Sequence, residues 1–381
     1  MKKTAEVAII GGGILGICTA YFLAQKGQKD IVVYEKDFLA QASTGLSVGG
    51  IRQQFTLPSN ILLSRETVRL FETFKKRFEK DINFRQVGYL FLAREEESWK
   101  DLVAGTEIQK HFKVPVTVLS PDDIKKRWPY IKVDDLKGGT FCEEDGYADP
   151  YLVTMAFAEK ARKLGVRIEE KTEITGIRLR NNQIEAIETS KGMVHTSKLV
   201  NTAGPWGGEI FKMAGIDVPV QPFRRQVFMT KAFDSIPKPV PMIIDTDVHF
   251  YIRGEHPGII MGMSDMEEPS SFNTHVDWDF LEQVIEVAVH RVPVLEKAQI
   301  LRGWAGLYSV TPDNNPVIGT IPEIKGLYFA TGFSGHGFQH GPPTGRILSE
   351  LIFKGSSSFD LKPFSWDRYN KKKQSEERRV V

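Results

Sequence analysis

The chain has 381 residues, with 50 lysines and arginines against 48 aspartates and glutamates, so its formal net charge is only +2. This balance argues against a nucleic-acid ligand or an anionic membrane surface as partner. With 41% hydrophobic residues the chain can bury a large core, in two domains or in one large domain with an insertion. No stretch reaches about 18 uncharged apolar residues, so we expect no membrane span.

The two cysteines, Cys18 and Cys142, are isolated, which indicates neither a disulfide framework nor a zinc site. Cys18 lies in an apolar segment and is expected to be a small core residue. This cysteine usage fits a reducing compartment, and we expect a cytoplasmic protein.

Hydrophobic periodicity predicts strands and helices in alternation through the first half of the chain. In chain order we expect a buried strand at 5–10, a helix at 14–26, a strand at 31–35, a helix at 59–80, a strand at 84–93, and helices at 120–128 and 149–165. Ser120 and Pro121 support the start of one helix, as a capping residue and a proline at the first helical position.

The second half is richer in strands. Two buried strands, 166–170 and 199–204, enclose an antiparallel meander at 174–180, 183–190 and 193–197. Residues 219–262 contain clustered prolines and strands without intervening helices, which predicts an antiparallel sheet. We then expect a helix near 277–291, strands at 301–304 and 327–331, a helix at about 343–354, and a solvated, frayed tail at 370–381.

A glycine turn joins the first strand to the first helix. Gly11, Gly13 and Gly16 form G-x-G-x-x-G, in which the glycines permit a tight turn, approach of a pyrophosphate, and close helix–strand packing. Glu35 ends the second strand, 19 residues after Gly16, where its carboxylate can accept hydrogen bonds from a ribose diol. This arrangement predicts a dinucleotide site, the alternative being an ordinary glycine-rich turn. FAD and NAD share the fingerprint, so the motif alone does not choose between them.

The far end of the chain favours FAD. Residues 328–352 read as a strand, a loop with five glycines, and a helix that begins near Pro343. Exposed backbone N–H groups and the positive end of that helix suit the pyrimidine edge of an isoalloxazine, which becomes negative on reduction. A nicotinamide cofactor needs no second glycine loop at this place.

Five segments together resemble the D-amino-acid-oxidase-like FAD-dependent oxidoreductases. They are IIGGGILG, STGLSVGGIRQQF, LVNTAGPWG, RGWAGLYSVTPDNNPVIG and ATGFSGHGFQHGPPTG. They look most like the β subunits of heterotetrameric sarcosine oxidase and of dye-linked L-proline dehydrogenase. The resemblance spans almost the whole chain in the same order.

The resemblance implies an α/β fold (α+β overall), in which a Rossmann-like FAD-binding domain is interleaved with an antiparallel-sheet substrate domain. We place the FAD-binding domain at 1–82, 146–218 and 300–381, and the substrate-binding domain at 83–145 and 219–299. The implied activity is oxidation of a small secondary or tertiary amino acid, with sarcosine and L-proline leading, by hydride transfer to flavin N5. Such chemistry needs a neutral amine, an anchored carboxylate and exclusion of water.

The resemblance also implies which residues contact the cofactor. Carried over by position, they are Gly11, Gly13, Ile14, Leu15, Gly16, Glu35, Lys36, Ser43, Thr44, Gly49, Gly50, Ile51, Ile174, Thr202, Ala203, Gly204, Trp206, Gly332, Gly335, His336, Gly337, Phe338 and Gln339.

Departures from the family pattern are informative. Gly306 and Leu46 stand where some relatives attach FAD through a cysteine or a histidine, so we expect noncovalent FAD. Ala148 matches the histidine that links FMN in heterotetrameric sarcosine oxidase, so any FMN at a subunit interface should be noncovalent. Gln339 stands where monomeric sarcosine oxidase has a carboxylate-binding lysine. The oxygen-activating lysine of that enzyme would fall near Ile260, so this chain lacks it.

The candidate catalytic residues are Arg52, Tyr251, Tyr308, His336 and Gln339. A guanidinium can grip a carboxylate with two hydrogen bonds, so Arg52 is the leading anchor, against the alternative of a surface ion pair. The alternative for each of the two tyrosines is a half-buried structural role. His336 suits a backbone role in the flavin loop, and although it shares a metal-like spacing with His340, we predict no metal.

Two other functions remain open at this stage. A glycine-oxidase-like enzyme would use oxygen, although Tyr308 replaces the arginine that such oxidases carry. A flavin-containing assembly subunit would not be catalytic. For the enzyme, the resemblance implies a larger partner subunit in a hetero-oligomeric dehydrogenase, with electrons leaving FAD for a second flavin.

Overall fold

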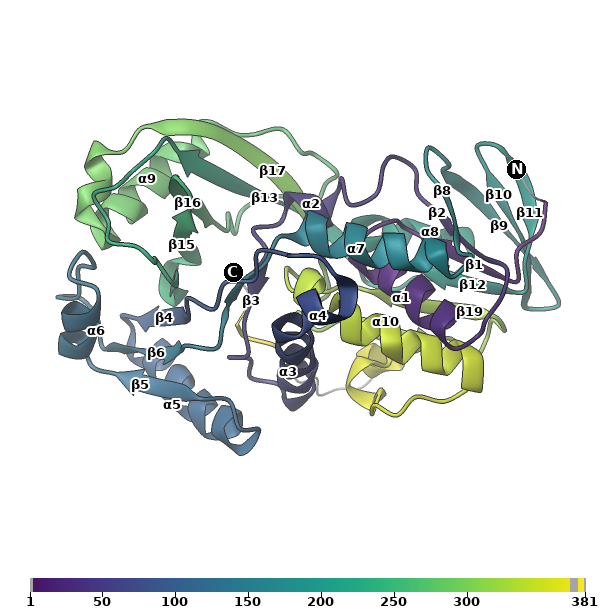
Figure 1. Cartoon of the computed structure of the whole chain (residues 1–381), viewed down its shortest axis with the longest axis horizontal. Coiled ribbons are helices and arrows are strands. Elements are labelled where there is room, and N and C mark those ends of the chain that lie inside the picture. Colours follow the sequence, from purple (N-terminus) through teal and green to yellow (C-terminus); the bar gives the residue numbers. More distant parts are fainter. Residues whose placement is uncertain (1–2, 371–375, 380–381) are drawn as a thin grey trace.

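The computed structural model describes residues 3–370 and 376–379. Two large sheets organise this part of the chain (Figure 1). One lies beside helices α1 (Ile14–Gln25) and α10 (Gly337–Lys354), and the other lies beside helix α9 (Phe280–Arg291). The fold is therefore mixed α/β with parallel and antiparallel sheets, as predicted. No helix in these two ranges is long and apolar enough to cross a bilayer.

The first sheet is parallel apart from its edge strand β18, which runs antiparallel to β19. Its strand order is β18 (Val317–Thr320), β19 (Leu327–Thr331), β12 (Lys198–Asn201), β1 (Val7–Ile10), β2 (Ile31–Tyr34) and β8 (Arg167–Glu169). β1 and β2 are buried along their whole length. Such continuous apolar runs are typical of parallel strands that are covered on both faces.

Each face of the first sheet has its own cover. Val7, Ile9 and Val33 pack in a core with helices α1 (Ile14–Gln25), α7 (Pro150–Lys163) and α10 (Gly337–Lys354). Ala8 and Val32 point the other way, toward helix α8 (Gly207–Met213) and the meander β9 (Ile174–Arg180), β10 (Gln183–Thr189) and β11 (Gly192–His195). The meander is antiparallel, as predicted. The buried, unpaired thiol of Cys18 belongs to the first of these cores, also as predicted.

The second sheet has eight strands and is antiparallel except between β14 and β4. Its order is β17 (Ile300–Val310), β13 (Gln221–Thr230), β16 (Gly258–Met263), β15 (Phe250–Glu255), β14 (Met242–Asp245), β4 (Tyr89–Ala93), β6 (Gly138–Cys142) and β5 (Val116–Leu119). A two-stranded pair, β3 (Gly50–Ile51) with β7 (Gly146–Tyr147), lies outside both large sheets. β17 falls in the range predicted for the FAD-binding domain, yet it pairs with β13 in this sheet.

Side chains of the second sheet alternate between two environments. On one face, Leu90, Ile243 and Ile252 pack in a core with α9 (Phe280–Arg291). On the other face, Tyr89, Phe91, Met242, Ile244 and the partly buried Tyr251 form a smaller cluster. Because the side-chain period of a strand is two, every second residue of these strands faces away from α9. That face becomes the wall of a cavity described below.

Several predicted elements differ in their bounds. The helix predicted at 59–80 is two helices, α3 (Pro58–Glu72) and α4 (Phe74–Phe78), separated at Thr73, whose φ of −103° and ψ of 4° leave the helical range. The strand predicted at 84–93 begins only at Tyr89, because Gly88 has a φ of +83°. Helix α6 (Pro121–Arg127) has the expected cap, and the Ser120 hydroxyl accepts from the backbone N–H of Asp123. Helices α2 (Ser43–Leu46) and α5 (Glu96–His111) were not predicted.

The last helix corrects the prediction most. α10 begins at Gly337 and continues through Pro342 and Pro343, so half of the expected glycine loop is helical. A Cβ on Gly341 would lie 2.6 Å from Ile14 Cγ1, and one on Gly345 would lie 2.6 Å from Cys18 Cβ. These two glycines therefore allow α10 to pack closely on α1, rather than open the backbone to a ligand.

Candidate functional site

The glycine turn has the geometry that its sequence predicts. Gly11 has a φ of +105°, and a Cβ there would lie 2.5 Å from the Thr202 carbonyl oxygen. A Cβ on Gly16 would collide with the Gly11 carbonyl and lie 2.8 Å from Thr202 Oγ1. Gly13 precedes the first residue of α1, with Thr44 Oγ1 3.0 Å from the place of its missing Cβ. At Gly11 and Gly16 side chains are excluded by backbone atoms, whereas the neighbour at Gly13 is a side-chain oxygen.

Two polar side chains complete the turn. One Glu35 carboxylate oxygen accepts from the Gly12 N–H at 2.7 Å, and the other accepts from the Asp37 N–H at 2.8 Å. Thr44 Oγ1 accepts from the Ile14 N–H at 3.2 Å. Polar oxygens thus already stand beside the positive end of α1, where anionic groups are favoured.

A cavity of about 410 Å³ extends from this turn. Most of the residues proposed to contact the cofactor line it, namely Gly11, Gly13, Ile14, Leu15, Glu35, Lys36, Ser43, Thr44, Ile174, Thr202, Ala203, Gly204, Trp206, Gly332, Gly335, Gly337 and Phe338. Lys36 Nζ lies 3.3 Å from the centroid of the Trp206 ring, a cation–π contact at the cavity wall. We call this space the nucleotide cavity.

A second, smaller cavity of about 110 Å³ adjoins the first. The two share seven lining residues, Ser43, Ser47, Leu307, Tyr308, Ser334, Gly335 and Phe338. Gly49, Gly50, His336 and Gln339, which were proposed for the cofactor, line this second cavity. Gly16 and Ile51 line neither, and Gly16 acts through packing. We call the second space the substrate cavity.

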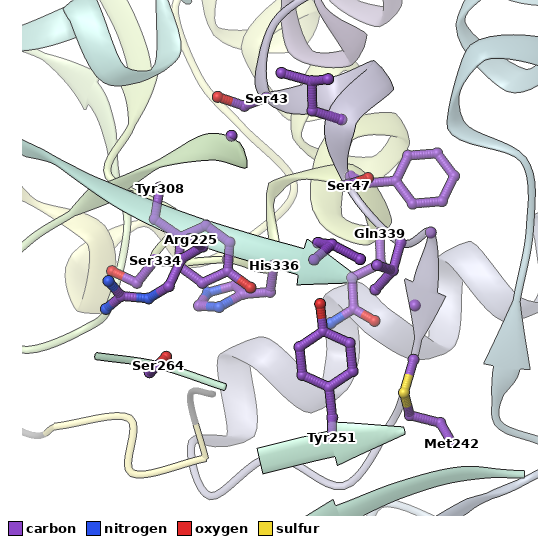
Figure 2. A pocket seen from close by; sticks show the side chains of 18 of the residues that line it. Ser43, Ser47, Arg225, Met242, Tyr251, Ser264, Tyr308, Ser334, His336 and Gln339 are labelled. Atoms are coloured by element: carbon purple, nitrogen blue, oxygen red, sulfur yellow. The ribbon is translucent and has the colours of Figure 1, made fainter. Parts of the chain in front are cut away.

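The predicted catalytic residues meet in the substrate cavity. Arg52, Tyr251, Tyr308, His336 and Gln339 all line it, and Figure 2 shows the last four from close by. They come from the segment after β3, from β15, from β17 and from the start of α10. Side chains separated by up to 287 positions therefore converge, as in the 2.7 Å hydrogen bond from the Arg52 N–H to Gln339 Oε1.

Tyr251 and Tyr308 each pack against a glycine. A Cβ on Gly262 would lie 2.6 Å from the Tyr251 hydroxyl oxygen, and a Cβ on Gly335 would lie 2.6 Å from Tyr308 Cζ. Burial raises the pKa of both tyrosine hydroxyls above the ordinary value. Both groups therefore stay protonated at neutral pH and can donate hydrogen bonds within the cavity.

His336 and His340 are buried near the start of α10, with ring centroids 4.9 Å apart. His340 Nε2 lies 2.8 Å from the Ser64 hydroxyl, whereas both ring nitrogens of His336 lack a hydrogen-bond partner. Burial lowers the pKa of His336 well below its ordinary value and that of His340 to about 3, so both rings are neutral. Within the described ranges, no three His, Cys, Asp or Glu residues come together as a metal site would require.

Arg52 has an unexpected neighbour. Its Nη2 donates to the carbonyl oxygen of Arg379, its Nη1 lies 3.4 Å from the Gln54 carbonyl, and its guanidinium carbon lies 3.9 Å from the Phe55 ring centroid. The Glu377 carboxylate, which is fully buried, accepts from the N–H groups of Thr56 and Leu57 at the start of α3.

These contacts correct the expected solvated tail. Residues 376–379 include buried side chains, because Glu377 satisfies backbone donors that the start of α3 would otherwise leave unpaired. Residues 371–375 and 380–381, the rest of that prediction, lie outside the described residues.

Sequence reasoning missed Arg225, which lies in β13 and lines the substrate cavity (Figure 2). Its guanidinium carbon lies 5.3 Å from the Tyr308 ring centroid. The alternation of β13 could have revealed it, because Val227 and Met229 belong to the cluster on the cavity side. A charged residue two positions before them is expected on the same face.

Comparison with known proteins agrees with this geometry. The family described as FAD dependent oxidoreductase (DAO) matches residues 6–351. The chain belongs to this family of FAD-dependent oxidoreductases. Its homologues are FAD-dependent amino acid dehydrogenases and oxidases.

Three proteins illustrate how similar this FAD-dependent oxidoreductase is to known members of the family. L-proline dehydrogenase from P. horikoshii has a TM-score of 0.90 and 34% identity, covering 98% of this chain and 100% of that one. FAD-dependent oxidoreductase domain-containing protein 1 of Xenopus laevis is 32% identical over all of this chain and 85% of the relative. Mitochondrial dimethylglycine dehydrogenase of Rattus norvegicus is 29% identical over 97% of this chain, which spans only 45% of that relative.

The residues of this oxidoreductase fit FAD. The turn at Gly11 and Gly16 has no room for side chains, and the nucleotide cavity runs from that turn to the start of α10. The Nε2 of Gln339 and both ring nitrogens of His336 are buried without partners on the adjoining wall, as expected for groups that face a polar ligand.

Proposed function

We propose that this FAD-dependent oxidoreductase oxidises a small secondary or tertiary amino acid, with sarcosine and L-proline as the leading substrates. The main observation behind this proposal is the substrate cavity, which shares seven lining residues with the nucleotide cavity. Two arginines line it, and no aspartate, glutamate or lysine does so within the described ranges. Such a cavity favours an anionic substrate. The 34% identity to an L-proline dehydrogenase and the 29% identity to a dimethylglycine dehydrogenase support the substrate class.

The cavity residues meet the needs of amine oxidation. When bound, FAD supplies a two-electron acceptor, its N5, for the hydride that leaves the carbon next to nitrogen. The two arginines make the cavity attractive to a carboxylate, the neutral His336 adds no charge, and the protonated Tyr251 and Tyr308 hydroxyls orient the substrate by donation. The apolar wall of Phe91, Met242 and Ile244 excludes water from the reacting carbon.

We further propose that FAD is held without a covalent bond. Gly306 and Leu46, the two positions where relatives in the resembled family carry the linking residue, lie together in the substrate cavity. Neither offers a nucleophile, and both cysteines of the chain are buried outside the lining of the two cavities. Acid or heat should therefore release intact FAD. Flavin fluorescence that stays with the polypeptide on a denaturing gel would contradict this.

The electron acceptor is proposed to be a partner chain, with a noncovalent FMN between the subunits. The chain spans less than half of rat dimethylglycine dehydrogenase, so a second chain could supply a further part of the electron path. No lysine from the described residues lines the substrate cavity, and Ile260 is an apolar core residue. The lysine that activates oxygen in the resembled oxidases therefore has no counterpart among the described residues of this cavity.

One experiment tests the whole proposal. The purified chain is mixed anaerobically with sarcosine, L-proline, dimethylglycine and glycine, and flavin absorbance is followed. Bleaching by a secondary or tertiary amino acid, with slow reoxidation in air and fast reoxidation by an artificial dye, is the expected result. Fast peroxide formation would favour a glycine-oxidase-like enzyme. A bound flavin that no amine reduces would favour a non-catalytic assembly subunit.

A further inference from the structure

We propose that Arg225, rather than Arg52, binds the substrate carboxylate, and that the N-substituent of the substrate lies against the apolar wall on the other side of the cavity. This inference rests on the proposed amino acid oxidation. It names the group that fixes the orientation of the substrate, and it narrows the substrate class.

The first observation is that Arg225 has an unused hydrogen-bonding edge. Nη1 donates to the Arg224 carbonyl oxygen at 2.8 Å, but Nε is buried without a partner. No ion pair involves this guanidinium within the described ranges. The edge formed by Nε and Nη2 matches the two oxygens of a carboxylate. Arg225 as a whole is partly buried, but a buried Nε donor without an acceptor is costly unless a ligand occupies it.

Three other arginines have their donors occupied by a carboxylate of the protein itself. The neighbouring Arg224 donates Nε and Nη2 to one oxygen of Glu268, at 3.0 and 2.7 Å. Arg291 pairs with both Asp135 and Asp245, and Arg368 holds Asp313. These framework arginines have a carboxylate from the protein itself. Arg225 instead faces a cavity that no aspartate or glutamate of the described residues lines, and a ligand carboxylate fits its open edge.

The second observation concerns Arg52, whose Nη1 and Nη2 each already have a backbone acceptor. Backbone carbonyls of Gln54 and Arg379 accept from Nη1 and Nη2, and the Phe55 ring covers one face of the guanidinium. A carboxylate could reach those donors only by displacing the segment at 377–379, which Glu377 holds on α3 by several hydrogen bonds. Arg52 therefore contributes positive charge and part of the wall of the substrate cavity, while Arg225 offers the donors that a carboxylate can reach.

The position of Arg225 sets the orientation of the substrate. Figure 2 shows Arg225 with Tyr308 and Ser334 on one side, and Tyr251 and Met242 on another. A carboxylate at Arg225 directs the rest of a small amino acid toward the apolar wall formed by β4 and β14. The favoured substrates are secondary amino acids with a small apolar N-substituent or ring, whereas a second carboxylate would be buried against that wall without a partner.

The test uses Arg225→Met, Arg225→Lys and Arg52→Met, with Arg180→Met as a matched control because Arg180 is a 77% exposed surface arginine. Anaerobic flavin reduction is measured with sarcosine and L-proline, and with sarcosinamide and L-prolinamide, which lack the carboxylate. Binding of pyrrole-2-carboxylate is measured separately, from the change that it causes in flavin absorbance. Flavin content and melting temperature report on folding.

We expect Arg225→Met to reduce the acid-over-amide preference, and to raise the Kd of pyrrole-2-carboxylate, by about tenfold or more. Arg225→Lys should lie between, and Arg180→Met should match the wild type. Arg52→Met should change the preference by less than about threefold, whatever its effect on rate. Loss of the preference in Arg52→Met but not in Arg225→Met would overturn the assignment.

The binding measurement separates this inference from the proposed function. If no amine reduces the wild-type flavin, the amino acid oxidation fails, but the Kd still tests Arg225. An unchanged Kd in Arg225→Met, or a wild type that binds no carboxylate, would overturn the role of Arg225 even if amines reduce the flavin.

Discussion

The two cavities adjoin, yet they are built in opposite ways. The nucleotide cavity starts at a turn in which backbone atoms leave no room for a side chain at Gly11 or Gly16. The substrate cavity is defined by side chains from β4, β13, β15, β17 and the start of α10. The first depends on the backbone of one six-residue turn and its contact with Thr202, and the second on the register of a sheet. Local features survive in a sequence motif, whereas a cavity wall assembled from distant strands leaves only scattered traces.

The largest expected effect lies in the turn. Gly16→Ala would place a Cβ against the Gly11 carbonyl oxygen and 2.8 Å from Thr202 Oγ1. Backbone must shift to relieve this, which moves α1 away from β1 and opens the nucleotide cavity. We expect the variant to be purified with almost no flavin, as measured by absorbance after acid release.

The control for that variant is Gly176→Ala, in the exposed meander. There the nearest atom to a new Cβ is Glu188 Oε2, at 3.0 Å, the end of a flexible side chain. This protein should keep its full flavin content. Normal flavin content in Gly16→Ala would show that the turn tolerates a side chain, and the contrast between the two cavities would fail.

The next effect concerns the wall around Arg52. Glu377→Ala removes the acceptor for the Thr56 and Leu57 N–H groups and for Asn60 Nδ2. Leaving these buried donors unpaired should lower the free energy of unfolding by about 2–3 kcal/mol, measured in urea. Glu377→Gln keeps an oxygen acceptor and should lose less. If Glu377→Ala is as stable as wild type, the segment at 376–379 does not contribute to this wall.

A smaller effect depends on pH. Asp145 is fully buried behind Arg52, where its Oδ1 accepts from the Gln53 N–H at 2.9 Å. Burial raises the pKa of this carboxyl to about 7. A raised native pKa means that the stability from this group is full below the unfolded value, about 3.9, and is lost as pH rises through 7.

Asp145→Asn should remove this dependence. The melting temperature of wild type minus that of Asp145→Asn is therefore expected to grow as pH falls from 8 to 6. Comparison across pH separates titration from any constant cost of placing an amide beside Gln53 and Gln54. A difference that stays flat over this range would mean that Asp145 does not titrate there.

The smallest effect returns to the nucleotide cavity. Thr44→Val keeps the shape of the side chain but removes the oxygen that accepts from the Ile14 N–H. Because Thr44 and Ile14 both line the nucleotide cavity, a loss of about 1 kcal/mol in holding the start of α1 for FAD corresponds to roughly a fivefold rise in the Kd of FAD. Thr44→Ser keeps the hydroxyl and should bind FAD normally, and equal affinity in Thr44→Val would remove this contact from the site.

The sequence alone determined the features whose causes are local. The glycine turn, Glu35 at the end of β2, the cap at Ser120 and the antiparallel meander follow from sterics, capping and period-two alternation over short stretches. The family motifs also predicted Arg52, Tyr251, Tyr308, His336 and Gln339 as catalytic candidates, and the structure brings these five residues to one cavity.

Tertiary structure decided what depends on distant neighbours. The sequence predicted a ligand loop at Gly341 and Gly345, but both glycines pack against α1. The prolines after Gly341 favoured a later helix start than the true one at Gly337. The burial of Glu377 depends on the unpaired donors of α3. Arg225 differs from the paired Arg224 only in what faces it, a cavity without a carboxylate rather than Glu268. Neighbours of this kind are set by sheet register and helix packing, which a single sequence does not encode locally.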